Sequence, residues 1–277
     1  MNYARVLTIQ DISCLGQCST TVALPILSAC GHETCILPSS VLSTHTYRFT
    51  DFTVRDLTDD IPGIQRHWQK ENISFDAIYT GYLGSQKQIG YVADIFRTMV
   101  RPGGMILVDP AMGDHGQLYY GFDDAYAKSM AKLCAMADVI LPNVTEACFM
   151  TDHPYQETYD RAYIDELLKK LHSLGCPCVV MTGVGFEPGT TGVLISRNGE
   201  ISHYVHPKLD RSYHGTGDCY SSAFVGALLQ GKSMEDAARI AADFVVRCIR
   251  NTIGDDEHWY GVKFETALGD LIADIRR

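Results

Sequence analysis

Short runs rich in β-branched and other apolar residues alternate along this chain with longer segments in which apolar residues recur at helical spacing. The short runs predict strands at Arg5–Gln10, Thr34–Leu37, Ala77–Tyr79, Met105–Asp109, Asp138–Leu141, Cys178–Thr182, Gly192–Ser196 and Ile201–Val205. The longer segments predict helices at Thr20–Cys30, Gln88–Val100, Asp123–Ala137, Ala162–Leu174, Cys219–Leu229 and Met234–Asn251. This alternation is typical of an α/β fold, with a mainly parallel central sheet flanked by helices on both faces.

The predicted helix at Met234–Asn251 is the clearest of these elements. Its apolar residues keep the i, i+3, i+4 spacing, Ser233 precedes it as an N-cap, and acidic residues occupy its first turn. The stretch from Val41 to Asp60 is polar, threonine-rich and weakly periodic. It predicts an excursion from the sheet, either a flap near the substrate or an ordinary surface insertion. No linker or repeat divides the sequence, so we expect a single domain over residues 1–277.

Composition places the chain among ordinary globular proteins. It has 277 residues, 46% of them hydrophobic, and a formal net charge of −10. Its basic residues form no long run, which makes nucleic acid and membranes poor candidates for partners. The ten cysteines lack the spacing of a zinc site or a disulfide framework, and no signal peptide or membrane span is evident. We therefore expect a reduced, cytoplasmic protein.

Polar clusters follow five of the predicted strands: Gln10–Ser13, Thr80–Tyr82, Asp109–Asp114, Pro142–Glu146 and Thr182–Gly185. Ligands of open parallel sheets bind beyond the carboxyl ends of the strands, so these clusters predict one ligand-binding edge. Mg²⁺ keeps several waters, bridges phosphates and prefers oxygen ligands, of which the clusters offer Asp109, Asp114, Asn143 and Glu146. Each has a structural alternative: Asp109 can cap the next segment, and Glu146 can lie in a solvated first helical turn. Neither a P-loop nor a complete dinucleotide-binding pattern is present.

The segment His214-Gly215-Thr216-Gly217-Asp218 is the most informative motif. Gly-Thr-Gly can present several backbone N–H groups to one anion, and the helix predicted from about Cys219 adds the positive end of a helix dipole. Asp218 places a carboxylate beside this anion site. An anion hole with an adjacent base is suited to moving a phosphoryl group onto a hydroxyl. An ordinary glycine turn with Asp near a helix N-terminus is the alternative.

Taken in order, these segments resemble those of the pyridoxal/pyridoxine (vitamin B6) kinases of the ribokinase-like superfamily, over essentially the whole chain. The segments that mark the superfamily are Pro142-Asn143-Val144-Thr145-Glu146-Ala147 and Gly215-Thr216-Gly217-Asp218. Those that point to the B6 branch are Ser43-Thr44-His45-Thr46, Thr80-Gly81-Tyr82 and Asp109-Pro110-Ala111-Met112-Gly113-Asp114. The resemblance implies a ribokinase-like fold and ATP-dependent phosphorylation of the 5′-hydroxymethyl group of pyridoxal, pyridoxine or pyridoxamine. It also implies Mg²⁺, often a monovalent cation such as K⁺ or Na⁺, and usually a homodimer.

The resemblance also implies roles for single residues. Asp218 is the implied catalytic base, and the implied anion hole is Gly215, Thr216 and Gly217. The residues implied to lie along ATP are Asp109, Asn143, Glu146, Thr182 and Gly183, and those around the metal are Asp109, Asp114 and Glu146. The implied vitamin pocket is lined by Asp11, Ser13, Thr46, Tyr82 and Asp218. Many relatives have Ser where this chain has Asp11, so Ser13 is a candidate to replace that serine, and the preferred vitamer stays open.

Two alternatives stay open at this point. A hydroxymethylpyrimidine kinase of the same superfamily also phosphorylates a hydroxymethyl group on a heteroaromatic ring. Some of its members have Cys where Asp218 stands, but the aspartate form exists too. A non-catalytic B6 ligand sensor that kept the fold is the second alternative, and the intact Asp218 and metal carboxylates argue against it.

Overall fold

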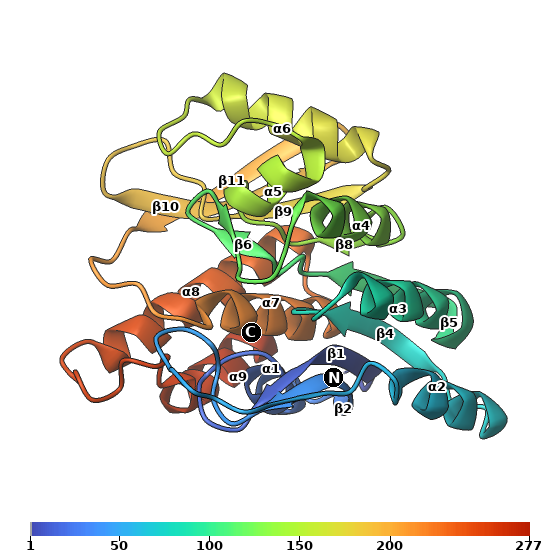
Figure 1. Cartoon of the computed structure of the whole chain (residues 1–277). Coiled ribbons are helices and arrows are strands. Elements are labelled where there is room, and N and C mark those ends of the chain that lie inside the picture. The colour runs from blue at the N-terminus through green and yellow to red at the C-terminus, as the bar shows by residue number, and fades with distance from the viewer. Residues whose placement is uncertain (1) are drawn as a thin grey trace.

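A computed structural model describes residues 2–277, and one sheet of nine strands forms its centre (Figure 1). The strands of this sheet are β1 (Arg5–Ser13), β2 (Glu33–Leu42), β3 (Val54–Asp56), β4 (Phe75–Thr80), β5 (Val100–Val108), β8 (Val139–Ile140), β9 (Cys178–Thr182), β10 (Thr190–Arg197) and β11 (Glu200–Pro207). Two further short strands, β6 (Gly113–Asp114) and β7 (Gln117–Leu118), lie outside it. The α-helices are α1 (Thr20–Ala29), α2 (Ile61–Lys70), α3 (Gln86–Met99), α4 (Asp124–Cys134), α5 (Val144–Thr151), α6 (Arg161–Ser173), α7 (Thr216–Leu229), α8 (Met234–Thr252) and α9 (Leu268–Arg276). A 3₁₀ turn at Phe264–Ala267 precedes α9.

The strand order of the sheet is β11-β10-β9-β8-β5-β4-β1-β2-β3. The six strands from β9 to β2 in this order run parallel, while β10, β11 and β3 pair antiparallel at the two edges. This confirms the predicted mainly parallel sheet. Strands β6 and β7 form a separate small hairpin. Because the parallel strands point the same way, the loops that follow them lie along one edge of the sheet.

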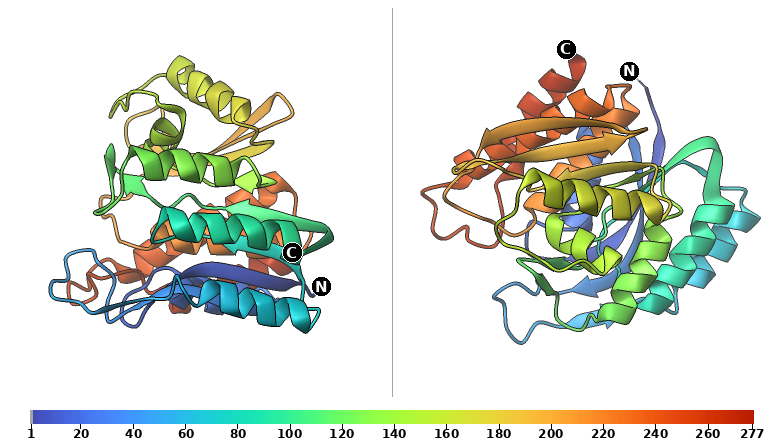
Figure 2. Two further views of the ribbon diagram at one scale, coloured as in Figure 1. Left: turned by 45° about the vertical axis from the view of Figure 1, so that its right-hand side comes forward. Right: turned by 90° about the horizontal axis from the view of Figure 1, so that it is seen from above.

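Helices cover both faces of the sheet, as predicted (Figure 2). Helices α1, α7, α8 and α9 pack on one face, against strand residues such as Val6, Ala77 and Tyr79. Helices α2 to α6 pack on the opposite face, against residues such as Leu7 and Ile78. Adjacent residues of β1 and β4 therefore point into different halves of the core, as is usual for strands buried on both sides.

Several features differ from the predicted elements. Helix α7 begins at Thr216 rather than at Cys219, so Asp218 lies inside its first turn. Val54–Asp56, predicted as part of an excursion, instead pairs with β2 as the edge strand β3, since β2 would otherwise leave its outer edge open. Helix α5 was not predicted, because it has only eight residues and nearly all of them are buried, so it lacks the periodicity of an amphipathic helix. Helices α2 and α9 were also missed.

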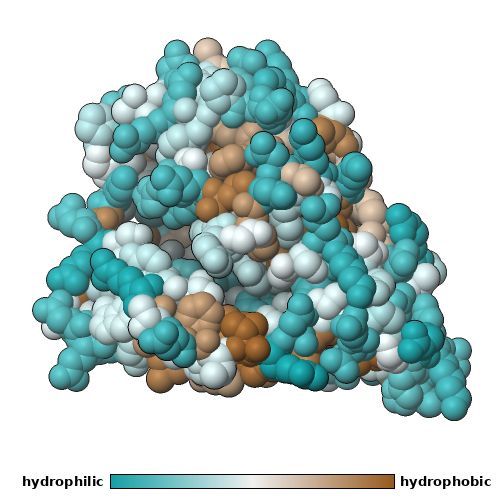
Figure 3. Space-filling view, viewed as in Figure 1, coloured by the Kyte–Doolittle hydropathy of each residue, from teal (hydrophilic) through white to brown (hydrophobic). Residues whose placement is uncertain are grey.

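The surface seen in Figure 3 is mainly hydrophilic, with hydrophobic residues gathered in small separate areas. Large apolar side chains that are exposed come from distant parts of the chain, for example Leu15, Tyr120 and Ile201. Within residues 2–277, no helix is long and apolar enough to cross a membrane. All ten cysteines are free thiols and most are buried, where they pack as small hydrophobic residues.

Candidate active site

The N-terminus of α7 lies at the carboxyl edge of the sheet, held there by a hydrogen bond from Ser221 Oγ to Asp109 Oδ2 (2.7 Å). Gly215, the N-cap, has a left-handed φ of 80°, and a Cβ there would overlap the carbonyl oxygen of Gln17. Glycine satisfies both constraints. The first helical residues, Thr216 to Asp218, have N–H groups with no acceptor inside the helix. Together with the helix dipole, these N–H groups form a site for an anion.

Two carboxyl groups with raised pKa values lie at this helix N-terminus. Asp218 is half-buried, and Asp109 is almost fully buried. Desolvation and the charge of Asp109 raise the pKa of Asp218 to about 7, although a hydrogen bond from the Ser19 N–H acts in the other direction. Burial raises the pKa of Asp109 to about 6, against the effect of the bond from Ser221. Both groups therefore change protonation state near neutral pH, as a residue that transfers protons needs to do.

The carboxyl end of β1 carries a further buried carboxylate of this edge. Asp11 is 5% exposed, and Ser13 Oγ donates a hydrogen bond to its Oδ2 at 3.0 Å. Burial raises the pKa of Asp11, while bonds from the hydroxyls of Ser19 and Ser13 lower it. Burial also dominates the raised pKa values of Tyr82 and Asp218, and the charge of Asp11 adds to both. The structure thus brings Asp11, Ser13, Tyr82 and Asp218 to one region.

Thr46 and Tyr82, both implied to line the vitamin pocket, have different surroundings. The Tyr82 ring is tilted against the ring of Phe122, with centroids 5.4 Å apart, so part of its surface is already covered. Thr46 is exposed on the loop between β2 and β3. The buried member of its motif is His45, whose ring fills the space in front of Gly16.

His45 joins two loops beside this region. Its Nε2 lies 2.8 Å from the carbonyl oxygen of Tyr260, and its Nδ1 accepts a hydrogen bond from the Tyr47 N–H, so the proton belongs on Nε2. The ring of His214, the residue before the anion site, lies 4.5 Å from the His45 ring and stacks on Tyr47. Burial lowers the pKa of His214 to about 4, so it is neutral at physiological pH. Sequence reasoning gave these rings no role, although both histidines stand in the quoted motifs.

Asn143 and Glu146 form a capping box at the start of α5. Asn143 Oδ1 accepts from the Glu146 N–H (2.9 Å), and Glu146 Oε2 accepts from the Asn143 N–H (2.8 Å). Glu146 Oε1 accepts a third bond, from the Met112 N–H at 3.1 Å. Glu146 is 3% exposed, and burial followed by the charge of Asp109 raises its pKa well above the usual range. Glu146 therefore lies in the first turn of a helix, as expected if its role is structural. The structure differs from that expectation in one respect, because the side chain is buried and not solvated.

The remaining predicted nucleotide residues surround this cap. Thr182 donates its N–H to the carbonyl of Pro142 (2.9 Å) at the end of β9, directly beside Asn143. Gly183 follows with a left-handed φ of 73°, and there is open space where a Cβ would lie. Asp114 is exposed on the β6–β7 hairpin, where it accepts the N–H of His115. Its charge still contributes to the raised pKa of Glu146, so it lies near the capping box.

Asp109 and Glu146 are the residues that best fit a divalent cation. They are two buried carboxylates whose charges repel each other, and a cation between or beside them would relieve that repulsion. The part of the chain that the structure describes contains no cluster of three or more His, Cys, Asp or Glu side chains arranged for a metal. Mg²⁺ usually takes only one or two protein carboxylates and completes its shell with water and phosphate. The donors present therefore fit Mg²⁺ bound together with a nucleotide.

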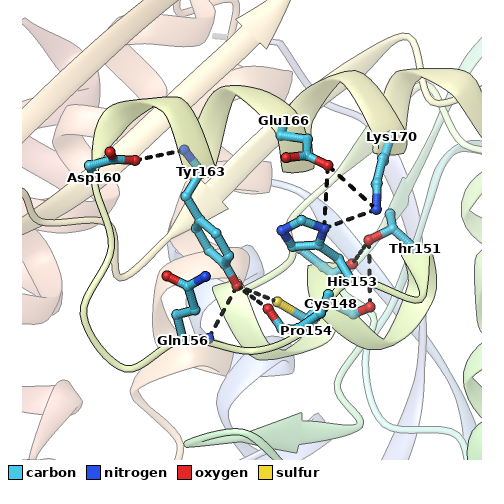
Figure 4. A network of polar contacts seen from close by, with 10 residues as sticks. Cys148, Thr151, His153, Pro154, Gln156, Asp160, Tyr163, Glu166 and Lys170 are labelled. Atoms are coloured by element: carbon cyan, nitrogen blue, oxygen red, sulfur yellow. Dashed lines mark hydrogen bonds and ion pairs between the residues drawn. The ribbon is translucent and has the colours of Figure 1, made fainter.

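A polar network joins the loop between α5 and α6 to these two helices (Figure 4). Tyr163 Oη donates to the Pro154 carbonyl (2.8 Å) and lies 3.1 Å from the Cys148 thiol. In the same loop, Tyr159 Oη donates to the carbonyl of Gly183 (3.3 Å), and the ring of Tyr155 covers Gly116 of the hairpin. The contacts of Tyr159 and Tyr155 therefore join this loop to two segments that border the predicted nucleotide residues.

Comparison with known proteins places the chain in a family. The phosphomethylpyrimidine kinase family matches residues 38–261, which is most of the chain and includes the α7 N-terminus. The chain belongs to this family. The pyridoxal kinase of Dictyostelium discoideum is 26% identical over 239 residues, 80% of this chain and 77% of that protein.

Two solved structures share the fold over nearly the whole chain. One, from Bacteroides thetaiotaomicron, is named as a phosphomethylpyrimidine kinase and was crystallised with pyridoxal. It is 39% identical with a TM-score of 0.91, and the match covers 96% of this chain and 95% of that one. The other, pyridoxal kinase from Lactobacillus plantarum, is 31% identical with a TM-score of 0.91 and covers 98% and 97% of the two chains. The predicted ribokinase-like fold and the resemblance to pyridoxal kinases are confirmed.

Proposed function

We propose that this protein transfers the γ-phosphoryl group of ATP to the 5′-hydroxymethyl group of pyridoxal, pyridoxine or pyridoxamine, as a pyridoxal kinase. One observation carries the proposal: an aspartate with a pKa of about 7 lies in the first turn of a helix whose N–H groups are free to bind an anion. This pairing suits phosphoryl transfer onto an alcohol. Family membership and the relatives named as pyridoxal kinases support the substrate class.

In this mechanism Asp218 accepts the proton of the substrate hydroxyl as the oxygen attacks phosphorus. A carboxylate whose pKa lies near the working pH is well matched to this task. The N–H groups of Gly215, Thr216 and Gly217 stabilise the charge on the oxygens of the moving phosphoryl group. The hydrogen bond from Ser221 to Asp109 holds the start of α7 in place. It thereby keeps Asp218 and the N–H groups of the anion site in place at the edge of the sheet.

ATP contacts are proposed at the neighbouring strand ends, through Asn143, Thr182 and Gly183. Mg²⁺, when bound, would neutralise phosphate charge and link the nucleotide to Asp109 and Glu146, with Asp114 nearby. The vitamin ring is proposed to lie by Asp11, Ser13 and Tyr82, with Thr46 at the exposed margin. A bound monovalent cation, K⁺ or Na⁺, a homodimer and a cytoplasmic location belong to the same proposal. Cation-replacement assays, light scattering and cell fractionation test these three points.

Hydroxymethylpyrimidine kinase is the second candidate, and a specific observation favours it. The matching family is described as phosphomethylpyrimidine kinase, and so is the Bacteroides relative. That relative was nevertheless crystallised with pyridoxal, so the name does not exclude a B6 substrate. A non-catalytic sensor is disfavoured, because a half-buried acid with a raised pKa beside an anion site is costly to keep without a catalytic use.

A substrate panel tests the proposal directly. The purified protein is incubated with Mg-ATP and each of pyridoxal, pyridoxine, pyridoxamine and hydroxymethylpyrimidine, and the phosphorylated products are identified by mass spectrometry. We expect the 5′-phosphate of at least one B6 vitamer at a kcat/KM above that for hydroxymethylpyrimidine. The reverse ranking would establish the pyrimidine kinase, and absence of turnover with all four would favour the sensor.

A further inference from the structure

The loop between α8 and the 3₁₀ turn brings residues 259–261 against the loops that follow β1 and β2. The base of this loop is closed by a hydrogen bond from the Lys263 N–H to Thr252 Oγ1 (2.9 Å). It is closed a second time by an ion pair between Lys263 Nζ and Asp255 Oδ2 (2.6 Å). Val262, which follows directly, is fully buried in the core beside α8. The 259–261 segment is therefore firmly attached to the body of the protein.

Trp259 contacts the loop between β2 and β3. Its ring lies against the ring of Phe49, with centroids 4.7 Å apart and planes inclined by 43°. Both side chains are half-buried. Aromatic pairs at this separation attract each other beyond the effect of the area that they bury. The pair therefore ties the loop that carries Thr46, proposed to lie at the margin of the vitamin pocket, to the 259–261 segment.

The backbone of Tyr260 holds the same loop at a second point. Its carbonyl oxygen accepts a hydrogen bond from His45 Nε2 at 2.8 Å. The His45 ring is buried, fills the space in front of Gly16 and lies 4.5 Å from the ring of His214. One hydrogen bond from the 259–261 segment thus fixes a ring that touches the loop after β1 and the residue before the anion site.

Gly261 approaches the loop after β1 directly. A Cβ at this position would overlap the side chain of Gln17, whose Nε2 donates a hydrogen bond to Glu265 Oε1 (2.9 Å). On its other side, the carbonyl of Gln17 lies against Gly215, the N-cap of α7. The loop after β1 is therefore enclosed between the 259–261 segment and the start of α7.

We propose that Trp259 and Tyr260 are positioning residues, which hold the loops after β1 and β2 against the start of α7 and so shape the vitamer side of the site. Trp259 acts through Phe49, and the Tyr260 carbonyl acts through His45. The residues proposed to contact ATP follow β8 and β9, and β5 and β4 lie between these strands and β1. Loosening the 259–261 segment should therefore weaken the binding of the vitamer and not that of ATP. The inference rests on the proposed kinase function and adds residues to it.

Four single substitutions isolate the contact between Trp259 and Phe49. Trp259→Ala removes it, Trp259→Phe keeps an aromatic ring in place, and Phe49→Ala removes the same contact from the other side. Trp68→Ala is the matched control. Trp68 is the other of the two tryptophans in the chain and is also half-buried. It packs edge-on against Phe75, at the start of β4, with ring centroids 5.5 Å apart.

We expect Trp259→Ala to raise KM for the vitamer about three- to tenfold, the effect of losing one aromatic contact, while KM for ATP stays at the wild-type value. Trp259→Phe should restore most of the loss. Combining Trp259→Ala with Phe49→Ala should add little to either change alone, because both remove the same contact. Trp68→Ala should match the wild type in both KM values. Equal rises of the two KM values in Trp259→Ala, or a lower Tm with both KM values unchanged, would show that the ring is only structural and would overturn the inference.

Hydrogen exchange followed by mass spectrometry tests the same contact without any activity. Amides of a loop exchange faster when the loop opens more often, so residues 43–53 should exchange faster in Trp259→Ala than in the wild type. Trp68→Ala should leave their exchange unchanged. If the wild type phosphorylates none of the vitamers, the proposed function fails, and this measurement still decides whether Trp259 holds the loop. Wild-type exchange of residues 43–53 in Trp259→Ala would overturn the inference.

Discussion

Acidic side chains at the two edges of the central sheet have different kinds of partner. At the amino edge, Arg101 Nη1 lies 2.6 Å from Asp76 Oδ1, and Arg5 Nε lies 3.0 Å from Glu33 Oε2. These charges are paired and partly exposed. At the carboxyl edge, Asp11, Asp109, Glu146 and Asp218 are bound instead by hydroxyl and backbone N–H donors. Asp76 and Glu33 at the amino edge each have a guanidinium partner, whereas within residues 2–277 none of the four acids at the carboxyl edge forms an ion pair with Lys or Arg.

The pKa values follow this difference. Partial burial raises the pKa of Asp76, but the Arg5 N–H and the Arg101 guanidinium outweigh it, so the net effect is a lowered value. Burial raises the pKa of every one of the four acids at the other edge. Charge that is unfavourable in the free protein but relieved by a ligand is typical of a functional site. The comparison therefore supports the candidate site without recourse to any motif.

The largest expected effect is on the base. Asp218→Asn preserves shape but cannot accept a proton, so kcat should fall by roughly 10²–10⁴-fold, with little change in the binding of ATP or vitamer. Steady-state kinetics and calorimetric titration measure the two quantities. Asp94→Asn, which changes an exposed carboxylate on α3, is the control and should leave kcat unchanged. A near-normal kcat in folded Asp218→Asn would remove Asp218 as the base.

A smaller loss is expected for Glu146→Gln. The amide keeps the size of the side chain but removes the charge that Mg²⁺ would meet, so the Mg²⁺ concentration needed for half-maximal rate should rise about tenfold. Stability should change too, because Glu146 accepts two backbone N–H bonds. Asp123→Asn, at the N-cap of α4, controls for the loss of a helix-capping carboxylate outside the site. If both variants lose stability alike and Mg²⁺ dependence stays at the wild-type level, Glu146 is purely structural.

Sequence reasoning reached those parts of the site that are local in the chain. The strand ends and the Gly-Thr-Gly-Asp segment were predictable, because hydrophobic periodicity and glycine conformations are properties of neighbouring residues. The contacts of Gln17 with Gly215 and of Ser221 with Asp109 were not, since they join residues far apart in sequence. The start of α7 was placed too late because Gly and Thr have low helix propensity, and tertiary packing outweighs that preference.

A change in selectivity is expected at Asp11. Asp11→Ser, the residue that many B6 kinases carry, removes a negative charge from the proposed ring pocket and leaves Ser13 in place. The kcat/KM ranking of pyridoxal, pyridoxine and pyridoxamine should change, with a relative shift of about three- to tenfold for the vitamer that depends most on a carboxylate. The three vitamers assayed in parallel measure it. An unchanged ranking would show that Asp11 does not contact the ring.

The smallest effects are thermal, and they should have opposite signs at the two edges. The pKa of Asp218 is raised in the fold, so the native state binds the extra proton and loses stability as pH rises from about 4 to about 7. Asp218→Asn removes that penalty and should raise Tm by a few degrees at about pH 8 and by less at about pH 5.

The pKa of Asp76 is lowered in the folded protein, so the ionised carboxylate stabilises the fold. This stabilisation is fully present above the pKa of the unfolded state and is lost as pH falls through the pKa of the folded state. Because this group is partly exposed, Asp76→Asn should lower Tm by only about 1–3 °C at about pH 7, with a smaller difference in acid and with kcat/KM unchanged. Differential scanning calorimetry of both variants over the same pH series makes the test. If Tm changed in the same direction in Asp218→Asn and Asp76→Asn, the carboxyl edge would not be destabilised by its own negative charge. The electrostatic argument for the site would then fail.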